Sequence, residues 1–213
     1  DDVLTRVGGG CATVNSFLGA LLSRLGFDIC LLPASILQED CHVTLLLQWE
    51  GLLYYVDVGN AYPYTTAARL GDATPRTAGD RTWRLRADDG GQFFVVEHLS
   101  ASVPDKWHTG VTFDPRRTVH FAFFIPMIVR SRTESTFGPF LRSLRLARFD
   151  AEFRIIAVRD RRLLANGSET AAASANDIVA FLISHYPDNL PLVEEAKKAL
   201  ELLMCAGHLT FPA

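Results

Sequence analysis

Three residues in the first sixty positions could supply a nucleophile, a base and a group that orients the base. Cys11 follows the glycines at 8–10 and opens a segment with helical periodicity. The partial positive charge at a helix N-terminus favours a thiolate over a thiol. His42 and Asp57 follow along the chain, and an imidazole held by a carboxylate is a suitable base for such a nucleophile. Taken singly, Cys11 could instead be an inert core cysteine and His42 a solvent-exposed strand end.

A β-hairpin is the element that would bring His42 and Asp57 together. Residues 43–49 and 52–58 are apolar and β-prone, and only Glu50-Gly51 separates them. A two-residue loop places Trp49 opposite Leu52, so His42 and Asp57 become diagonal neighbours on one face. The other face is expected to be the core face: Val43, Leu45, Leu47, Trp49, Leu52, Tyr54, Val56 and Val58.

The remaining pattern predicts an α+β chain. Apolar residues recur at helical spacing after Cys11 and should face the core: Val14, Phe17, Leu18, Leu21, Leu22 and Leu25. Short β-prone runs separated by turns then indicate an antiparallel sheet or small barrel: 27–32, 82–87, 92–99 and 119–125. Three further strands and two helices are expected towards the C-terminus: 144–149, 152–159, 161–164, 176–185 and 191–204.

Composition narrows the class of protein. Of 213 residues 48% are hydrophobic, which suffices for a packed core, and the net charge of −3 with no basic block argues against a nucleic-acid surface. No apolar run has transmembrane length, so we expect no membrane association. Four cysteines without a CxxC pair favour a reduced cytoplasmic protein.

Two other readings of this region are disfavoured. Cys11, Cys30, Cys41 and His42 lack the paired spacing of structural zinc sites, so we expect no metal. The glycines at 8–10 are not followed by Lys-Ser/Thr or preceded by a strand, which excludes a P-loop.

The stretches around the three residues resemble the arylamine N-acetyltransferase family. Its nucleophile motif, Arg-Gly-Gly-x-Cys-x-x-x-Asn before an apolar helix ending in Leu-Gly-Phe or Leu-Gly-Tyr, is similar to residues 8–15 and 25–27. Its histidine opens an apolar strand, as at 42–45, and its aspartate lies in Val-Asp-Val-Gly, as at 56–59. Residues 133–137 look like the segment before the family's last sheet, and the resemblance extends from Thr5 to about Leu190.

The resemblance implies the family's cysteine-protease-like acetyltransferase fold, with a helical segment, an antiparallel β-barrel and an α/β lid. We place these parts at residues 1–34, 35–135 and 136–213. The first part would carry the nucleophile and be a remnant of the family's N-terminal helical domain, which is otherwise largely absent.

The resemblance also implies a reaction. Acetyl-CoA, as co-substrate, would acylate Cys11, and the acetyl group would pass to an arylamine, arylhydroxylamine or hydrazine, as in xenobiotic metabolism. His42 would hold the proton and later assist the amine, and Asp57 would fix the imidazole tautomer and support its positive form. The Cys11 backbone amide is a candidate oxyanion donor.

Departures from the family pattern leave the acceptor open. Val7 replaces an arginine, Ala12-Thr13 replaces an aromatic-Glu pair, and Asn60 stands where the family has a phenylalanine that lines the acceptor pocket. Gly59 and Asn60 are therefore the candidate substrate-pocket residues. The alternatives are an amide synthase that releases or cyclises a polyketide acyl chain from an acyl carrier protein, a thiol hydrolase, and a non-catalytic relative.

Overall fold

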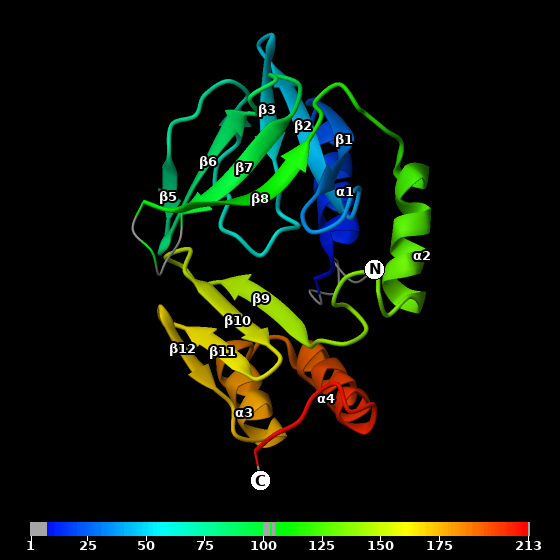
Figure 1. Ribbon diagram of the computed structural model, residues 1–213, viewed down its shortest axis with the longest axis vertical. Coiled ribbons are helices and arrows are strands. Elements are labelled where there is room, and N and C mark those ends of the chain that lie inside the picture. The colour runs from blue at the N-terminus through cyan, green and yellow to red at the C-terminus, as the bar shows by residue number, and fades with distance from the viewer. Residues whose placement is uncertain (1–7, 100–102, 104, 213) are drawn as a thin grey trace. The chain divides into compact units, whose positions relative to one another are not determined.

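The computed structural model describes residues 8–99, 103 and 105–212, and its helices and antiparallel sheets confirm the α+β class (Figure 1). The chain divides into two compact units after Val129. We call residues 8–129 the sheet unit and residues 130–212 the C-terminal unit. Helix α2 (Ile125–Thr133) passes from one to the other. The three-part division at residues 34 and 135 stays a prediction.

The sheet unit contains one antiparallel sheet in the order β4-β3-β2-β1-β8-β7-β6-β5. Figure 1 shows this sheet strongly curled, as a partly closed barrel would be. Its strands are β1 (Asp28–Ser35), β2 (His42–Trp49), β3 (Leu52–Val56), β4 (Ala68–Arg69), β5 (Arg76–Ala78), β6 (Arg81–Ala87), β7 (Phe94–Leu99) and β8 (Trp107–Phe113).

The predicted hairpin is confirmed with its register. Trp49 pairs with Leu52, and the ladder continues to Leu45 opposite Val56. Glu50 and Gly51 both have positive φ, 50° and 75°, as a tight hairpin turn whose twist matches its strands requires. The register therefore places His42 and Asp57 on one face, just beyond the last paired residues.

The expectation of a single core face on this hairpin is wrong. Leu46 and Tyr55, on the same face as His42, belong to the core enclosed by the curled sheet. Val43 and Leu45, on the other face, are also fully buried, and helix α1 (Cys11–Arg24) packs on β1 and β2. On the expected face, Trp49 and Leu52 at the hairpin tip and Val58 beyond the end of β3 are 40–50% exposed. The strand ends nearest the candidate site are thus covered on both faces.

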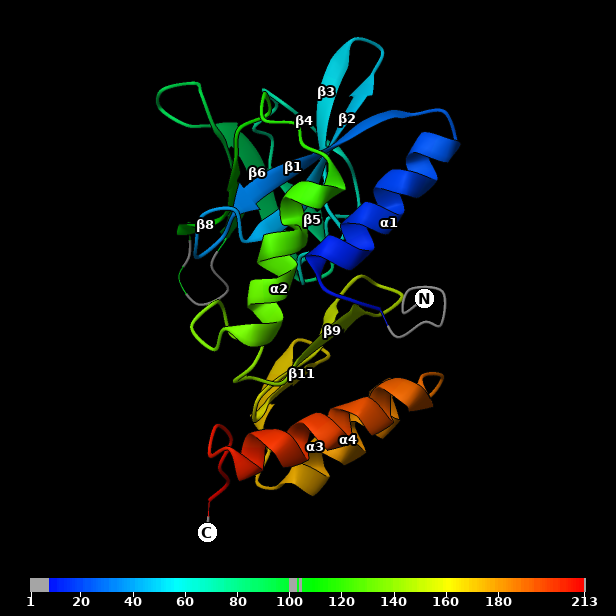
Figure 2. The same ribbon diagram turned by 90° about the vertical axis from the view of Figure 1, so that its right-hand side faces the viewer.

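Helix α1 forms as predicted but buries a different stripe. Asn15 and Gly19 are its buried residues, whereas Phe17, Leu21 and Leu25 are 41%, 45% and 65% exposed. Gly19 permits a close approach, because a Cβ there would lie 3.0 Å from a methyl carbon of Leu45. Figure 2 shows the helix running across the sheet strands that it covers.

The sheet unit also departs from the sequence prediction elsewhere. Residues 119–125 are not a strand, since Val119 forms one isolated bridge to Leu31 and the chain then enters a 3₁₀ helix, Phe121–Phe124, followed by α2. Strand β8, which was not predicted, has Gly110 in its middle, and glycine normally weakens a strand. A Cβ at Gly110 would overlap the His98 ring, so packing in the folded sheet explains the glycine.

The C-terminal unit contains the three predicted strands and the two predicted helices, together with a fourth strand, β12, that was not predicted. Its antiparallel sheet has the order β12-β11-β10-β9, and helices α3 and α4 pack together. The bounds are β9 (Arg145–Phe149), β10 (Ile155–Arg159), β11 (Arg162–Ala165), β12 (Ser168–Ala171), α3 (Ala175–His185) and α4 (Leu190–Cys205). Its core has Val158, Ile178, Leu182 and Val193 at its centre.

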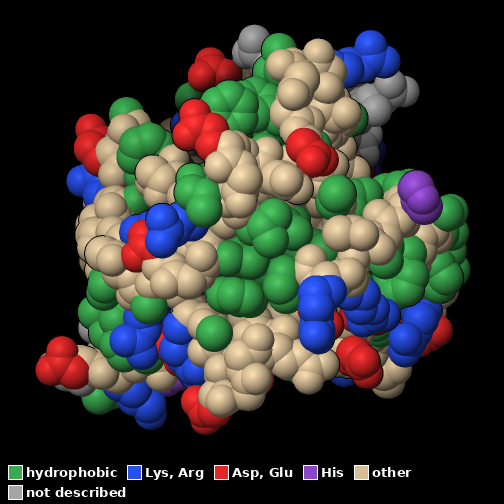
Figure 3. Space-filling view, turned by 90° about the horizontal axis from the view of Figure 1, so that it is seen from above, with side chains coloured by type: hydrophobic (Ala, Val, Ile, Leu, Met, Phe, Trp, Pro, Cys, Tyr) green, Lys and Arg blue, Asp and Glu red, His purple; other side chains and the backbone are tan. Residues whose placement is uncertain are grey.

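Hydrophobic side chains also reach the surface. Figure 3 shows them gathered near the middle of the face seen from above, between charged groups of both signs. In helix α2 no residue is buried, and Ile125 and Val129 are about half exposed. Within the described ranges, no helix has both the length and the apolar character needed to cross a membrane.

Candidate active site

Cys11 is the first residue of helix α1. Gly10 precedes it in an extended conformation, and the Gly10 carbonyl accepts the first helical hydrogen bonds, from the amides of Thr13 and Val14. The amides of the first turn therefore point towards the N-terminal end, where Cys11 lies. This is the junction of glycine loop and helix that the sequence predicts, and its partial charge favours a thiolate.

His42 begins strand β2, and Asp57 follows the last residue of β3. His42 Nε2 lies 2.7 Å from Asp57 Oδ2, and each residue is 2% exposed. The Cys11 side chain hydrogen-bonds with His42 in turn. The structure thus brings the three predicted residues into one hydrogen-bonded chain in the predicted order.

Asp57 accepts hydrogen bonds at both carboxylate oxygens. Oδ2 accepts from His42 and from the Tyr55 hydroxyl, both at 2.7 Å. Oδ1 accepts from the Asn15 side chain at 2.8 Å, the Gly59 amide at 2.7 Å and the Asn60 amide at 3.2 Å. A buried carboxylate with this many donors is held in the ionised state and in one orientation.

Asn15 ties the helix to both strands of the hairpin. Its Nδ2 donates to the Val43 carbonyl at 2.6 Å as well as to Asp57, and its Oδ1 accepts from the Val58 amide at 2.8 Å. It is fully buried. Its position four residues after Cys11 puts the two on one side of the helix, so this carboxamide sets the distance between nucleophile and base.

The ionisation of the three groups follows from these contacts. Burial raises the pKa of the Cys11 thiol, but the hydrogen bond and charge of His42 outweigh it and leave the pKa below its ordinary value of 9.0. Burial lowers the pKa of His42, yet the charge and hydrogen bond of Asp57 raise it to about 10. Burial raises the pKa of Asp57, and the His42 charge and the donors at both oxygens lower it more. The favoured state is a thiolate, an imidazolium and a carboxylate.

Gly59 and Asn60, the candidate substrate-pocket residues, lie directly against these groups. A Cβ at Gly59 would be 2.6 Å from Cys11 Cα and 2.6 Å from Asn15 Nδ2, so only glycine lets the loop after β3 pass the start of α1. The Asn60 side chain donates to the Tyr64 hydroxyl at 3.3 Å. Both residues therefore pack against the candidate catalytic groups. That they contact a substrate stays a prediction.

Two residues of the site were assigned no role from the sequence. Asn15 matched the family motif, and its spacing from Cys11 was the signal for a shared helix side. Tyr55 lies two positions before Asp57, and that spacing placed both on one strand face. Sequence spacing could not tell that the tyrosine hydroxyl would bond to the carboxylate.

Another histidine of the curled sheet, His98, lies in a cluster of aromatic side chains. His98 of β7 stacks on Tyr62, with ring centroids 3.8 Å apart and an interplanar angle of 9°. Its Nε2 is hydrogen-bonded with the Tyr64 hydroxyl. Burial, followed by the charges of Arg81 and His108, lowers the pKa of His98 to about 4 against the opposing effect of Asp57. His98 is therefore neutral near pH 7.

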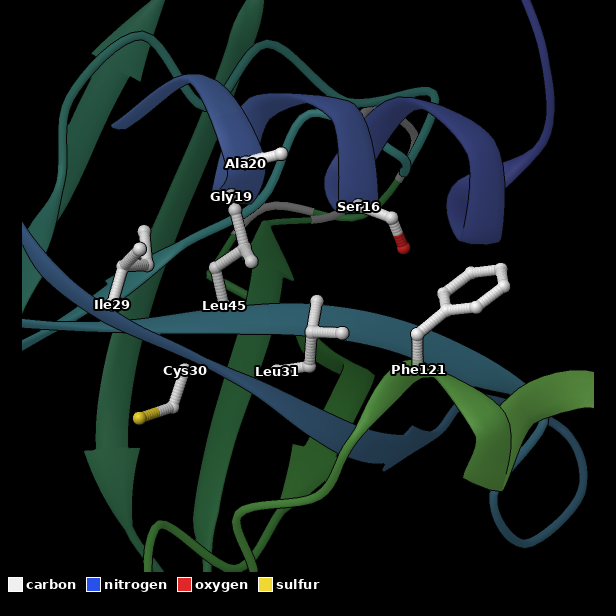
Figure 4. Close-up of a pocket in the computed structure, with 8 residues that line it drawn as sticks. All are labelled: Ser16, Gly19, Ala20, Ile29, Cys30, Leu31, Leu45 and Phe121. Atoms are coloured by element: carbon white, nitrogen blue, oxygen red, sulfur yellow. The ribbon is translucent and has the colours of Figure 1, made fainter. Parts of the chain in front are cut away.

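An apolar pocket of about 330 Å³ lies beneath helix α1. Figure 4 shows Leu31 and Leu45 pointing towards the helix, with Phe121 at one end and Cys30 directed away. Ser16 Oγ is buried in the described structure without a hydrogen-bond partner. The residues lining the pocket are Ser16, Gly19, Ala20, Ile29, Cys30, Leu31, Leu45 and Phe121. Among the described residues, Cys11, His42 and Asp57 do not line this pocket.

The site was not expected to hold a metal ion. In the portion of the chain that the structure describes, no group of three or more His, Cys, Asp or Glu side chains is arranged to hold a metal ion. The charged groups of the site are instead bonded to one another.

Comparison with known proteins identifies the family. The family model described as N-acetyltransferase matches residues 2–182. The chain belongs to this N-acetyltransferase family. Membership confirms the resemblance and makes the chain an acyltransferase. No curated protein matches it.

Solved structures of arylamine N-acetyltransferases share the fold of this N-acetyltransferase. The enzyme from Mycobacterium tuberculosis has a TM-score of 0.74 at 21% identity, over 92% of this chain and 77% of its own. The enzyme from Salmonella typhimurium has a TM-score of 0.72 at 16% identity, over 86% and 69%. A third, from Bacillus cereus, has a TM-score of 0.65 at 18% identity, over 83% and 72%, and is described as having a unique Cys-His-Glu catalytic triad.

Proposed function

We propose that the enzyme transfers an acetyl group from acetyl-CoA to an arylamine, arylhydroxylamine or hydrazine through an acyl-enzyme on Cys11. The observation that supports this best is the chain of Cys11, His42 and Asp57 at the start of helix α1. Family membership supplies the acyl-transfer chemistry. The Bacillus cereus structure is described as having a Cys-His-Glu catalytic triad, and Cys11, His42 and Asp57 would form a similar set with aspartate as the acidic residue.

The first half-reaction forms the acyl-enzyme. The Cys11 thiolate attacks the thioester carbonyl carbon, the bond between that carbon and the CoA sulfur breaks, and the His42 imidazolium gives its proton to the departing CoA thiolate. Asp57 keeps the imidazole oriented and supports its charge before that transfer. The amides at the start of α1, with that of Cys11 as the candidate donor, would stabilise the developing oxyanion.

The second half-reaction passes the acetyl group to the amine. Once Cys11 is acylated its negative charge is gone, so His42, having lost its proton, can accept one from the attacking nitrogen. The bond between the acyl carbon and the Cys11 sulfur breaks, and the thiolate is regenerated. His42 returns to the imidazolium beside Asp57, and the cycle is complete.

The absence of disulfides among the described cysteines is consistent with an enzyme that acts in a reducing compartment. All four described cysteines, Cys11, Cys30, Cys41 and Cys205, are free thiols. We therefore place the reaction in the cytoplasm, where a thiolate nucleophile stays reduced.

Mass spectrometry tests the proposal directly. After mixing with acetyl-CoA, the intact mass should increase by one acetyl group, and peptide mapping should place it on Cys11. Adding an arylamine should then remove the group and yield the N-acetyl product. Cys11→Ser should abolish turnover because an alcohol lacks thiolate character, whereas Cys205→Ser, an exposed cysteine in α4, should behave as wild type.

The same experiment separates the alternatives. No gain of mass with acetyl-CoA, but a gain with a longer acyl thioester, would contradict the acetyl donor and favour the amide synthase. Acylation that water removes as fast as an amine does would favour the thiol hydrolase. Absence of any acyl-enzyme with all thioesters would contradict the nucleophile.

A further inference from the structure

Two different donors meet at one oxygen of Asp57. His42 Nε2 and the Tyr55 hydroxyl each lie 2.7 Å from Oδ2. We propose that Tyr55 is a positioning residue for acyl transfer, whose hydroxyl shares Oδ2 with His42 and so limits the support that Asp57 gives to the imidazolium. That the reaction is acyl transfer rests on the function proposed above. The hydrogen bonds at Oδ2 are independent of that proposal.

Packing fixes the Tyr55 hydroxyl in this position. The residue is 1% exposed, and its ring stacks on Phe113 with centroids 5.2 Å apart and packs edge-on against Tyr64. A phenol has one hydrogen, so a Tyr55 hydroxyl that donates to Asp57 has none left for another acceptor. Burial, and then the negative charge of Asp57, raise the pKa of Tyr55 well above 10. The hydroxyl is therefore a donor throughout the working pH range.

The other carboxylate oxygen makes the effect of Tyr55 separable from the position of Asp57. Oδ1 is held independently by Asn15 and by the amides of Gly59 and Asn60. Removing the Tyr55 hydroxyl should therefore leave the carboxylate in place with one donor fewer. The negative charge on Oδ2 is then concentrated on His42, and the imidazolium is favoured more strongly.

The other titratable groups near Asp57 should not obscure the effect of Tyr55 on the ionisation of His42 and Cys11. Helix α1 contributes Cys11 and strand β2 contributes His42, and these two titrate as a pair. The loop after β3 contributes Tyr64, whose pKa burial raises well above 10, and β7 contributes His98, which is neutral near pH 7. Arg81 of β6 lowers the pKa of His98 by its charge. Between about pH 5 and 8, a change in charge near Oδ2 therefore comes from Cys11 and His42.

The rate at which iodoacetamide alkylates Cys11 reports the ionisation of the Cys11–His42 pair, because the thiolate is the reacting species. The assay needs no acyl donor. Trypsin releases residues 7–24 with Cys11 as their only cysteine, so mass spectrometry follows the correct thiol. In Tyr55→Phe, the midpoint of the rate against pH should lie about half a pH unit below that of the wild type. Tyr54→Phe, the same change on the opposite strand face, should leave it unmoved.

The direction of the shift decides the outcome. If Tyr55 merely kept Asp57 in place, Tyr55→Phe would weaken the support for His42 and raise the midpoint, as Asp57→Asn should. An unchanged or raised midpoint in a folded Tyr55→Phe protein overturns the proposal. Should Tyr55→Phe fail to fold, 3-fluorotyrosine at position 55 is a stronger donor and should raise the midpoint, and an unchanged midpoint then overturns it.

Failure of the proposed function is a separate result. A protein that shows the Tyr55→Phe shift but is never acetylated by acetyl-CoA retains the role of Tyr55 and loses the proposed substrate. A protein that is acetylated normally but shows no alkylation shift retains the substrate and loses the role of Tyr55.

Discussion

Two histidines of the same curled sheet, the buried His42 and the half-buried His98, have opposite electrostatic surroundings. His42 bonds to a carboxylate, and the charge of Asp57 raises its pKa to about 10 despite burial. His98 bonds to the neutral Tyr64 and lies near Arg81, so burial prevails and its pKa falls to about 4. Burial alone would keep both neutral, and the charge of the partner therefore decides which one can supply a proton at pH 7.

The contrast also gives the two histidines opposite effects on stability. The pKa of His42 is raised on folding. Its contribution to the free energy of unfolding is therefore fully present below about pH 6.5 and is lost as pH rises towards 10. The pKa of His98 is lowered, so its contribution is complete above about pH 6.5 and is lost as pH falls towards 4.

Removing the carboxylate charge should have the largest effect, because it gives His42 a neutral partner like that of His98. In Asp57→Asn we expect acylation to slow by about 10⁴, since the amide favours the wrong tautomer and does not support the imidazolium. The acidic limb of single-turnover acylation should also move to higher pH. Asp72→Asn, at a partly exposed residue paired with Arg76, is the matched control and should keep the wild-type profile. Superimposable profiles for Asp57→Asn and wild type would contradict the role of Asp57.

Displacing the loop beside Cys11 should have an intermediate effect. Gly59→Ala places a Cβ 2.6 Å from Cys11 Cα, so the loop or the start of α1 has to move. We expect a loss of about 1–3 kcal/mol in unfolding free energy and a fall of about 10² in acylation rate. Gly90→Ala, where the nearest atom is 3.6 Å away and φ is not positive, should change neither in urea unfolding and single-turnover assays. Wild-type behaviour of Gly59→Ala would show that the close approach is unimportant.

The last prediction concerns His98 and is limited to stability at acidic pH. In His98→Phe, which keeps a ring to stack on Tyr62, the acid-dependent part of stability that His98 contributes should disappear. The wild type should lose up to about 3 kcal/mol more than the variant between pH 6.5 and 4, as measured by urea unfolding. His108→Phe, a substitution at the cross-strand neighbour of His98, is the control and should retain the acid dependence. NMR titration of the ring resonances should show His98 neutral down to about pH 4, and a midpoint near 6.5 would contradict its environment.

Local sequence pattern determined the hairpin, its register and the start of helix α1. Glu50-Gly51 fits only a short turn, and a two-residue turn fixes every later pairing, so the meeting of His42 with Asp57 was predictable. Glycines before Cys11 and the apolar helix after it placed the thiol at a helix N-terminus in the same way. These features depend on residues close together in the chain.

The tertiary structure decided everything that depends on which surfaces meet. The buried stripe of α1 is set by Asn15 bonding to the hairpin and by Gly19 admitting Leu45, which outweigh the apolar periodicity of Phe17 and Leu21. Strand β8 can carry a glycine at position 110 because the space above it is filled by the His98 ring, which comes from another strand. Whether a histidine is charged, and whether a tyrosine bonds to a carboxylate, likewise depends on distances and burial that exist only after long-range packing, because electrostatic energy falls with separation and exposure to water.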